Sequence, residues 1–335
     1  MPENLIRRVR IMKALRDFPD APKRTLARAL HAENAALFPS IEAARCLIGT
    51  ITGARGSVSK KVADKSLFRP KGVSGADAWE GMMPESWSEP IEPFILPTSI
   101  RSLLVLSDIH VPFHDIDALK IAIRYGIAAK PDAVLLNGDT LDFYAISDHE
   151  KDPRKVKWHG ELEAGRAVLR MIRSAFPNVP VYFKEGNHDF RLERHLMKHA
   201  PVLISMPEFE LPTLLRFAEV GVEYIANKRL IYAGELTIGH GDEWKGGGGM
   251  TPARWAGMKA KDNVLLGHFH RISEHIDTTI RGKSLGYWST GCLCEKQPQY
   301  HPHMNNWHHG FAIVHIETDG SFEVENKKIV NGKVR

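Results

Sequence analysis

Five short clusters of acidic, amide and imidazole side chains stand out in this 335-residue sequence. In chain order they read D-x-H, G-D-x-x-D, G-N-H-D, G-H-G-D and G-H-x-H, and they begin at Asp108, Gly138, Gly186, Gly239 and Gly267. Carboxylate, carboxamide and imidazole groups are the mixed oxygen and nitrogen donors that hold divalent transition metals. The clusters therefore indicate metal-dependent chemistry.

Each cluster follows a short apolar run that has the character of a buried strand. These runs are residues 103–106, 133–137, 179–185, 235–238 and 263–266. In an open α/β sheet, ligands bind beyond the carboxyl ends of the strands. Five such strand ends can therefore bring their polar residues to one site.

From residue 100 onward, strand and helix patterns alternate. Helices are expected at 116–129, within 157–175, at 190–198 and near 211–220. Later strands are expected at 229–241, 285–290, 310–318 and 321–330, with a hairpin turn at Asp319-Gly320. Early βαβ units followed by a β-rich half predict an α/β fold in which two sheets pack face to face and helices lie outside.

The first part of the chain has a different charge. Residues 1–71 contain 15 Lys and Arg against 6 Asp and Glu, whereas residues 72–335 contain 30 against 34. Helices are expected at 5–18, 25–37 and 41–52, the last with Ser40 as its N-cap. Three short helices with basic faces resemble a helix-turn-helix module, which would place Arg45 or residues 52–57 against DNA or RNA phosphates. The alternative is a helical appendage that packs on the main domain or on a partner protein.

Residues 72–98 are rich in proline and contain Trp79 and Trp87 without clear periodicity. We therefore expect three parts: a basic helical module (1–71), a linker (72–98) and a catalytic domain (99–335). No apolar run approaches the roughly 20 residues that a membrane-spanning helix needs. The N-terminus also lacks the apolar centre of a signal peptide, so a cytoplasmic protein with no membrane partner is expected. No oligomeric state can be inferred.

Cys46, Cys292 and Cys294 are too few for a disulfide framework, which agrees with a reducing compartment. The spacing of Cys292 and Cys294 suggests a zinc site. No second pair of Cys or His residues accompanies them at metal-binding spacing, so packing as small apolar residues is the favoured interpretation.

The ordered set of clusters resembles the calcineurin-like metallophosphoesterase superfamily, over about residues 103–270. That superfamily includes Ser/Thr protein phosphatases, cyclic-nucleotide phosphodiesterases and double-strand-break repair nucleases. The resemblance implies a two-sheet βαββ-type sandwich and two divalent metal ions, with Mn²⁺ as the expected metal and Fe, Zn, Ni or Mg as alternatives. The basic module ahead of the catalytic domain also resembles the layout of phage and prophage phosphoesterases.

By the same resemblance, the ligands of one metal are Asp108, His110, Asp139 and His270. Those of the other are Asp139, Asn187, His240 and His268, so that Asp139 bridges. Two ions roughly 3.5 to 4 Å apart lower the pKa of a bridging water and clamp the phosphoryl oxygens, which implies attack by a bridging hydroxide. His188 would be the acid that protonates the leaving oxygen, and Asp142 would orient it. The alternatives for Asp142 are a helix N-cap and a surface acid.

Two departures bear on the substrate. Protein phosphatases have an arginine where this chain has Phe143, and a glutamate where it has Asp189, while the G-H-x-H ending looks like the phosphodiesterase and nuclease branches. We therefore expect a phosphate-ester substrate, and specifically a phosphodiester of nucleic acid or nucleotide. The second possibility is a phosphomonoester of a protein or small molecule. A metal-bearing, non-catalytic DNA-binding scaffold is the alternative from another class.

Overall fold

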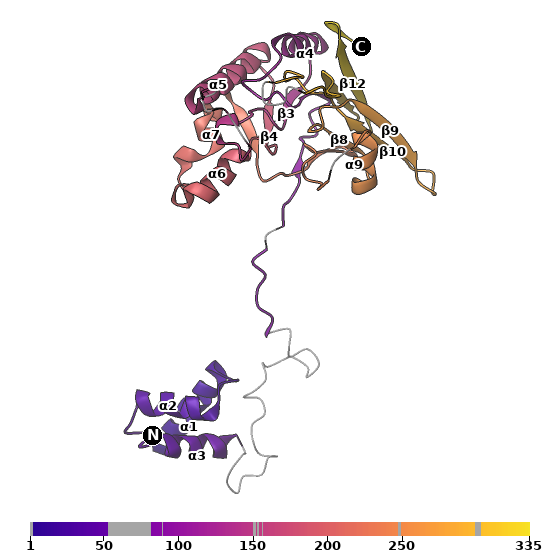
Figure 1. The fold of residues 1–335 in the computed structure, drawn as a ribbon. Helices are drawn as coiled ribbons and strands as arrows, with labels where there is room; N and C mark the ends of the chain where they lie inside the picture. Colours follow the sequence, from indigo (N-terminus) through magenta and orange to yellow (C-terminus); the bar gives the residue numbers. More distant parts are fainter. Residues whose placement is uncertain are drawn as a thin grey trace. The chain divides into compact units, whose positions relative to one another are not determined.

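The computed structural model describes residues 3–52, 82–88, 90–149, 152, 154–155, 157–246, 249–298 and 303–335. The chain divides into two compact units, Met1–Glu89 and Pro90–Arg335 (Figure 1). Residues 53–57 of the proposed phosphate-contacting segment and residues 72–81 of the expected linker lie outside the described residues.

Residues 3–52 of the first unit form three α-helices, α1 (Glu3–Asp17), α2 (Lys23–Glu33) and α3 (Ile41–Ile51). They enclose a small apolar core that includes Ile11, Leu26, Leu30, Phe38 and Ile48. Ser40 caps α3 as predicted, since its Oγ accepts a hydrogen bond from Ala43 N at 3.1 Å. Helix α2 ends four residues earlier than expected, because the Asn34 side chain accepts the N–H of Leu37 and turns the chain.

The second unit contains a seven-stranded sheet in the order β13-β12-β11-β2-β3-β4-β5. Its parallel half consists of β2 (Ser102–Leu106), β3 (Ala133–Asn137), β4 (Val181–Lys184) and β5 (Val222–Ile225). Its antiparallel half consists of β11 (Gly310–Ile316), β12 (Phe322–Val330) and β13 (Lys333–Val334). The predicted turn at Asp319-Gly320 connects β11 and β12.

A six-stranded sheet has the order β1-β6-β7-β8-β10-β9. Its strands are β1 (Phe94–Ile95), β6 (Ile231–Ala233), β7 (Leu236–Ile238), β8 (Val264–Leu266), β10 (Ser284–Ser289) and β9 (Ser273–Thr278). The single strand predicted at 229–241 is in fact the hairpin β6-β7, because the chain reverses at Gly234, whose φ is +61°. Strand β1 lies within the range predicted as linker, and it pairs in parallel with Ile231 and Tyr232.

Helices cover the outer faces of both sheets (Figure 1). The seven-stranded sheet carries α4 (Ile116–Ala129), α5 (Trp158–Ala175), α6 (Arg191–His199), α7 (Leu211–Leu214) and α8 (Phe217–Val220), and the six-stranded sheet carries α9 (Pro252–Ala260). Single 3₁₀ turns occur at Tyr144–Ile146, Pro201–Leu203 and Pro207–Phe209. The helix expected near 211–220 is divided between α7 and α8, because Arg216 has a φ of +57°. No helix among the described residues is both long and apolar enough to span a bilayer.

The alternation of side chains along β2 shows how the layers are held. Leu104 and Leu106 belong to the core beneath the helices, whereas Leu103 and Val105 belong to the core between the two sheets. The predicted α/β sandwich is therefore confirmed. Since apolar layers cover both faces of the central strands, the loops at their carboxyl ends are where polar residues can gather.

Candidate metal centre

The loops after five strands bring all seven predicted metal ligands together. Strands β2, β3 and β4 end just before Asp108, Asp139 and Asn187, while β7 and β8 end just before His240 and His268. Their polar atoms form two groups with one residue in common. The first group comprises Asp108, His110, Asp139 and His270, and the second comprises Asp139, Asn187, His240 and His268.

In the first group, imidazole nitrogens face carboxylate oxygens. His270 Nε2 lies 3.2 Å from Asp108 Oδ1, and His110 Nε2 lies 3.7 Å from Asp139 Oδ2. The Nε2 atoms of His110 and His270 are themselves 3.1 Å apart. Donor atoms at this spacing surround a common point, as the ligands of a cation do.

In the second group, His240 Nε2 lies 3.1 Å from Asp139 Oδ2 and 3.3 Å from Asn187 Oδ1. The potential ligand atoms of Asp139, His240 and His268 all lie within 4.8 Å of one another. Asp139 Oδ2 is thus the atom that contacts both groups.

The backbone at the site is unusual. Five of the seven predicted ligands have a left-handed backbone, with φ between 49° and 64°: Asp108, His110, Asp139, His268 and His270. Non-glycine residues in sparsely populated backbone regions cost roughly 1–3 kcal/mol each, and they persist only where the surroundings hold them. Here the N–H groups of His188 and His268 donate to Asp139 Oδ1 at 2.8 Å and Asp108 Oδ2 at 2.9 Å.

Two glycines permit the close packing of these loops. A Cβ atom on Gly186 would lie 2.3 Å from Asp139 Oδ1, and one on Gly267 would lie 1.9 Å from Ser107 Oγ. Neither position can accept a larger residue without moving a carboxylate of the site or the serine beside it. Close packing thus explains why glycine is required at the first position of the G-N-H-D and G-H-x-H clusters.

Two of the histidines are oriented by their Nδ1 atoms. His240 Nδ1 lies 2.9 Å from the backbone oxygen of Asn137, and His110 Nδ1 lies 3.1 Å from Asp142 Oδ2. Both partners can only accept hydrogen bonds, so Nδ1 must be the donor in each ring. This leaves the Nε2 lone pair available inside the ligand group, which is the usual arrangement of metal-binding histidines.

The electrostatics of the first group favour a cation. Burial alone would lower the pKa of His270, yet attraction by the Asp108 carboxylate raises it to about 9. Burial would likewise raise the pKa of Asp108, but His270 lowers it to about 2. The two buried carboxylates, Asp108 and Asp139, thus call for positive charge. Carboxylate, carboxamide and imidazole donors at these distances fit divalent ions.

His188 and Asp142 lie beside the first group. His188 is 16% exposed, and its Nδ1 lies 3.2 Å from the backbone oxygen and 3.4 Å from Oδ2 of Asp142. Asp142 is only 1% exposed, and the following 3₁₀ turn has Phe143 at its N-cap position. Its position therefore fits neither the surface-acid nor the N-cap alternative.

Arg191 is a site residue that the sequence did not reveal. Its Nη2 lies 3.1 Å from His188 Nε2, and its Nη1 donates to the Asp142 backbone oxygen at 2.8 Å. It is the first residue of α6 and comes three residues after His188. This spacing at the start of a helix is the one feature of the sequence that could have indicated that Arg191 belongs to the site. Phe143, which takes the place of the phosphatase arginine, is fully buried and stacks on Trp158 at 5.3 Å between ring centroids. Arg191 thus places a positive charge beside His188 and Asp142.

Asp189, which stands where protein phosphatases have a glutamate, has a structural role. It accepts hydrogen bonds from the N–H groups of Gly186 and Leu141, both at 3.0 Å, and so connects the third cluster to the second. Burial, together with the nearby Asp139 charge, raises the pKa of Asp189 to about 7.

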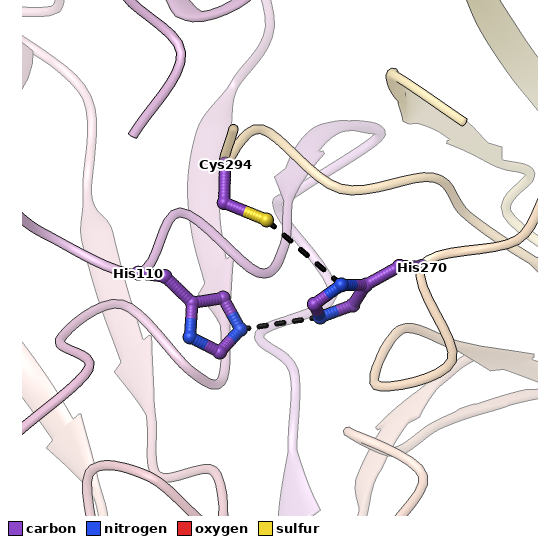
Figure 2. A group of neighbouring side chains, drawn as sticks. All are labelled: His110, His270 and Cys294. Carbon is purple, nitrogen blue, oxygen red and sulfur yellow. Dashed lines mark hydrogen bonds between the residues drawn. The ribbon is translucent and has the colours of Figure 1, made fainter. Parts of the chain in front are cut away.

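Cys294 lies beside the first group, on its outer side (Figure 2). Its Sγ is 3.8 Å from His270 Nδ1, whereas His270 faces His110 and Asp108 through Nε2. The Cys292 Sγ instead points to the backbone oxygens of Cys294 and His308. The two cysteines therefore do not converge on a zinc ion; one of them supports a histidine of the candidate centre.

A cavity of about 500 Å³ opens over the two groups. Most of the residues that line it are polar, including His188, Arg191 and His268, and two aromatic residues, Tyr144 and Trp307, also line it. The Trp307 ring lies 4.2 Å from the His270 ring, centroid to centroid. The cavity is large enough for a phosphate together with an organic group attached to it.

The chain is similar to several known proteins. The family model described as calcineurin-like phosphoesterase matches residues 101–283. The Gene 54 protein of Mycobacterium phage L5 is 30% identical over 240 residues, covering 65% of this chain and 89% of the phage protein. The Gene 54 protein of Mycobacterium phage D29 is 29% identical over 234 residues, with the same coverage. Among solved structures, a single mutant of Vps29 from Entamoeba histolytica covers 70% of this chain and 96% of its own, at 16% identity and a TM-score of 0.36.

The matched range contains all seven predicted ligands as well as His188 and Asp142, and it spans more than half of the chain. This chain therefore belongs to the calcineurin-like phosphoesterase family, and it is a metal-dependent hydrolase of phosphoric esters.

Proposed function

We propose that this chain hydrolyses phosphodiesters of nucleic acids or nucleotides at a centre that holds two divalent metal ions. The observation that carries the proposal is the position of Asp139, whose Oδ2 lies 3.1 Å from His240 Nε2 and 3.7 Å from His110 Nε2. One carboxylate is thus available to both ligand groups. The first ion would be held by Asp108, His110, Asp139 and His270, and the second by Asp139, Asn187, His240 and His268.

When bound, two ions held by these residues would activate water and neutralise the charge of the phosphoryl oxygens. We propose Mn²⁺ as the metal, because three oxygen-donor side chains accompany four imidazoles in the donor set and no thiolate does. Fe, Zn, Ni and Mg are the alternatives that reconstitution tests.

His188, Asp142 and Arg191 complete the reaction. Arg191 binds a non-bridging phosphate oxygen through its guanidinium group, whose planar donors match phosphate. Asp142 accepts the Nδ1 proton of His188, while Arg191 Nη2 lies 3.1 Å from His188 Nε2. When the guanidinium turns to the phosphate, Nε2 becomes free to carry a proton toward the leaving oxygen. Protonated His188 then gives its Nε2 proton to the leaving oxygen as the phosphorus–oxygen bond breaks.

The cavity walls favour a diester over a monoester. A diester carries an organic group on each side of the phosphorus, and Tyr144 and Trp307 supply aromatic surfaces beside the centre. A nucleobase stacked on an aromatic side chain gains about 1–3 kcal/mol. Phosphomonoester hydrolysis is the second candidate, because Arg191 lies where a guanidinium could bind a terminal phosphate.

The test is a panel of metals and substrates on metal-free protein reloaded with each ion. The substrates are bis(p-nitrophenyl) phosphate, p-nitrophenyl phosphate, cyclic nucleotides and labelled DNA. We expect the highest turnover with Mn²⁺ and a diester, and a preference for p-nitrophenyl phosphate would favour the monoesterase instead. Absence of turnover on every substrate despite two bound ions would favour the non-catalytic scaffold.

Asp139→Asn tests the shared carboxylate itself. The variant is expected to lose at least one bound ion and nearly all activity, because an amide offers one oxygen and no charge. Asp117→Asn, at an exposed position of α4, is the matched control and should change neither quantity. Elemental analysis showing two bound ions in pure Asp139→Asn would contradict the bridging role.

We propose further that the first unit contacts nucleic-acid phosphates through α1 and α2. Exposed basic residues gather there, namely Arg8, Lys13, Arg16, Arg24 and Arg28. Helix α3 is less suited to this role, because Arg45 pairs with Glu42 at 2.7 Å. Arg24 and Arg28 are one helical turn apart and therefore share a face.

The double variant Arg24→Ala, Arg28→Ala should weaken duplex binding. It should also reduce the slope of log K against log salt concentration by about 1.8, since each phosphate contact contributes about 0.9. Arg45→Ala is the control. If the double variant binds DNA with unchanged affinity and slope, the unit has another role, such as protein contact.

A further inference from the structure

A second cavity adjoins the metal cavity at the start of α6. It measures about 90 Å³, and it shares Arg191 and His149 with the larger cavity. A single water molecule needs roughly 15 Å³ of such space. The smaller cavity therefore has room for a group of several atoms next to the reaction centre.

The charge of this cavity comes from one face of α6. Arg191, Arg194 and His195 are spaced at i, i+3 and i+4, so they share a helical face, and all three line the cavity. Arg194 Nη2 donates to the backbone oxygen of Asn187 at 3.3 Å, which directs the guanidinium toward the cluster that holds a predicted ligand. Within the described part of the chain, Arg194 forms no ion pair with a carboxylate. Its charge is therefore available to a ligand.

One acidic side chain, Asp148, also lines the cavity. Lys198, one further turn along the same face of α6, pairs with it at 2.7 Å between Nζ and Oδ2. This pair is balanced in charge, so the positive charge of Arg194 remains. The carboxylate of Asp142 similarly accompanies Arg191 at 3.3 Å.

We propose that this cavity, the α6 subsite, binds a second phosphate group of the substrate, adjacent to the one that is hydrolysed. The inference rests on the proposed function, and it makes the substrate class more specific: an oligonucleotide strand, whose successive phosphates would lie on either side of Arg191. Guanidinium groups are suited to this ligand because they donate to phosphate oxygens in pairs. Apart from Ile146, the lining is polar, which disfavours a base or another apolar group in the same place.

The test compares dinucleotides that differ only in a terminal phosphate. The substrates are TpT, pTpT and TpTp, with the full chain loaded with Mn²⁺. We expect the wild-type protein to have a KM about tenfold lower for one of the two phosphorylated dinucleotides, the size of one charge-assisted hydrogen bond. Arg194→Ala should abolish that preference, so that the KM values for all three dinucleotides become equal. Arg170→Ala, an exposed arginine on α5, is the control and should behave as wild type.

The outcomes separate the subsite from the proposed function. If wild-type protein hydrolyses TpT but shows equal KM values for all three dinucleotides, the subsite is refuted while the diesterase remains. If no diester is hydrolysed, the proposed function fails. The subsite is then tested by measuring the binding of fluorescent oligothymidylate to the metal-free protein. There, Arg194→Ala should weaken binding and reduce the salt slope by about 0.7; unchanged affinity and slope would overturn the proposal. Inhibition by the mononucleotide pTp as strong as by pTpT would overturn the assignment to a strand.

Discussion

Two substitutions at Asp142 should separate the support of the first metal site from the orientation of His188. Three donors converge on this buried carboxylate. His110 Nδ1 lies 3.1 Å and His188 Nδ1 lies 3.4 Å from Oδ2, while Arg191 Nη1 lies 3.3 Å from Oδ1. Burial alone would raise the pKa of Asp142, but the hydrogen bonds from His110 and His188 hold it well below its usual range. The carboxylate is therefore ionised at any pH near neutrality.

The expected loss of metal affinity depends on how many hydrogen-bond acceptors each variant keeps at position 142. Asp142→Ala removes both oxygens, so His110 loses the partner that fixes its ring, and loss of such a partner weakens metal binding about 10- to 100-fold. Asp142→Asn keeps one oxygen, which can still accept from His110. The change from a charge-assisted to a neutral hydrogen bond then costs about 1 kcal/mol, or about fivefold in affinity. Both variants leave His188 without its negative partner, so both should lower kcat for an alkyl diester about 100-fold.

The assay is a chelator-competition titration of each metal site, combined with steady-state kinetics on an alkyl and a p-nitrophenyl diester. The expected order of affinity at the first site is wild type, Asp142→Asn, then Asp142→Ala. Asp117→Asn again serves as the control. If Asp142→Ala bound both ions with wild-type affinity, His110 would need no such partner and the reasoning would be wrong.

Three further predictions concern residues around the centre. His188→Ala should retain both ions and lose about 10² to 10⁴ in kcat on an alkyl diester, with a smaller loss on a p-nitrophenyl diester; equal losses would argue against the acid role. Burial, followed by the Asp142 charge, raises the pKa of Glu161 from 4.5 to about 7. Between pH 4.5 and about 7, the unfolded chain therefore loses a proton from Glu161 that the folded state keeps. The free energy of unfolding falls by about 3 kcal/mol over this range, at 1.36 kcal/mol per pH unit. Glu161→Gln should therefore stabilise the fold more at pH 8 than at pH 5 in urea unfolding; an equal effect at both would contradict the shift. Cys294→Ala should weaken the first metal site about tenfold while Cys294→Ser restores it, because a hydroxyl can also accept from His270 Nδ1; identical affinities would leave Cys294 with packing alone.

The sequence was sufficient to predict the two-sheet sandwich and to bring the predicted ligands to one place. Short apolar runs identify buried strands, and a polar cluster directly after a strand must lie at its carboxyl end. The positions of Asp108, Asp139, Asn187, His240 and His268 follow from this alone. Strand β1 could not be found in the same way, because two residues carry no periodic signal and pair only once Ile231 is in place.

Other parts of the centre depend on tertiary packing, which cannot be predicted from a local sequence pattern. Arg191 and Arg194 reach the cavities only because α6 starts directly after the third cluster and turns one face toward them. Cys294 is 24 residues from His270, and the two meet because β8 and β10 are parallel neighbours whose ends lie side by side. The break at Gly234 also arises from packing, since a Cβ there would lie 2.4 Å from the backbone oxygen of Gly320.

The buried pair of Lys184 and Glu243 shows how the fold positions one predicted ligand, His240. Lys184 ends β4 in one sheet, Glu243 follows β7 in the other, and Lys184 Nζ lies 2.7 Å from Glu243 Oε1. Burial would raise the pKa of Glu243, yet Lys184 lowers it to about 2, so the Glu243 carboxylate is ionised at neutral pH. The same carboxylate accepts the N–H groups of His240 and Gly241 at 2.9 and 2.7 Å. A predicted ligand of the second group is thus positioned by a carboxylate that forms an ion pair between the two sheets.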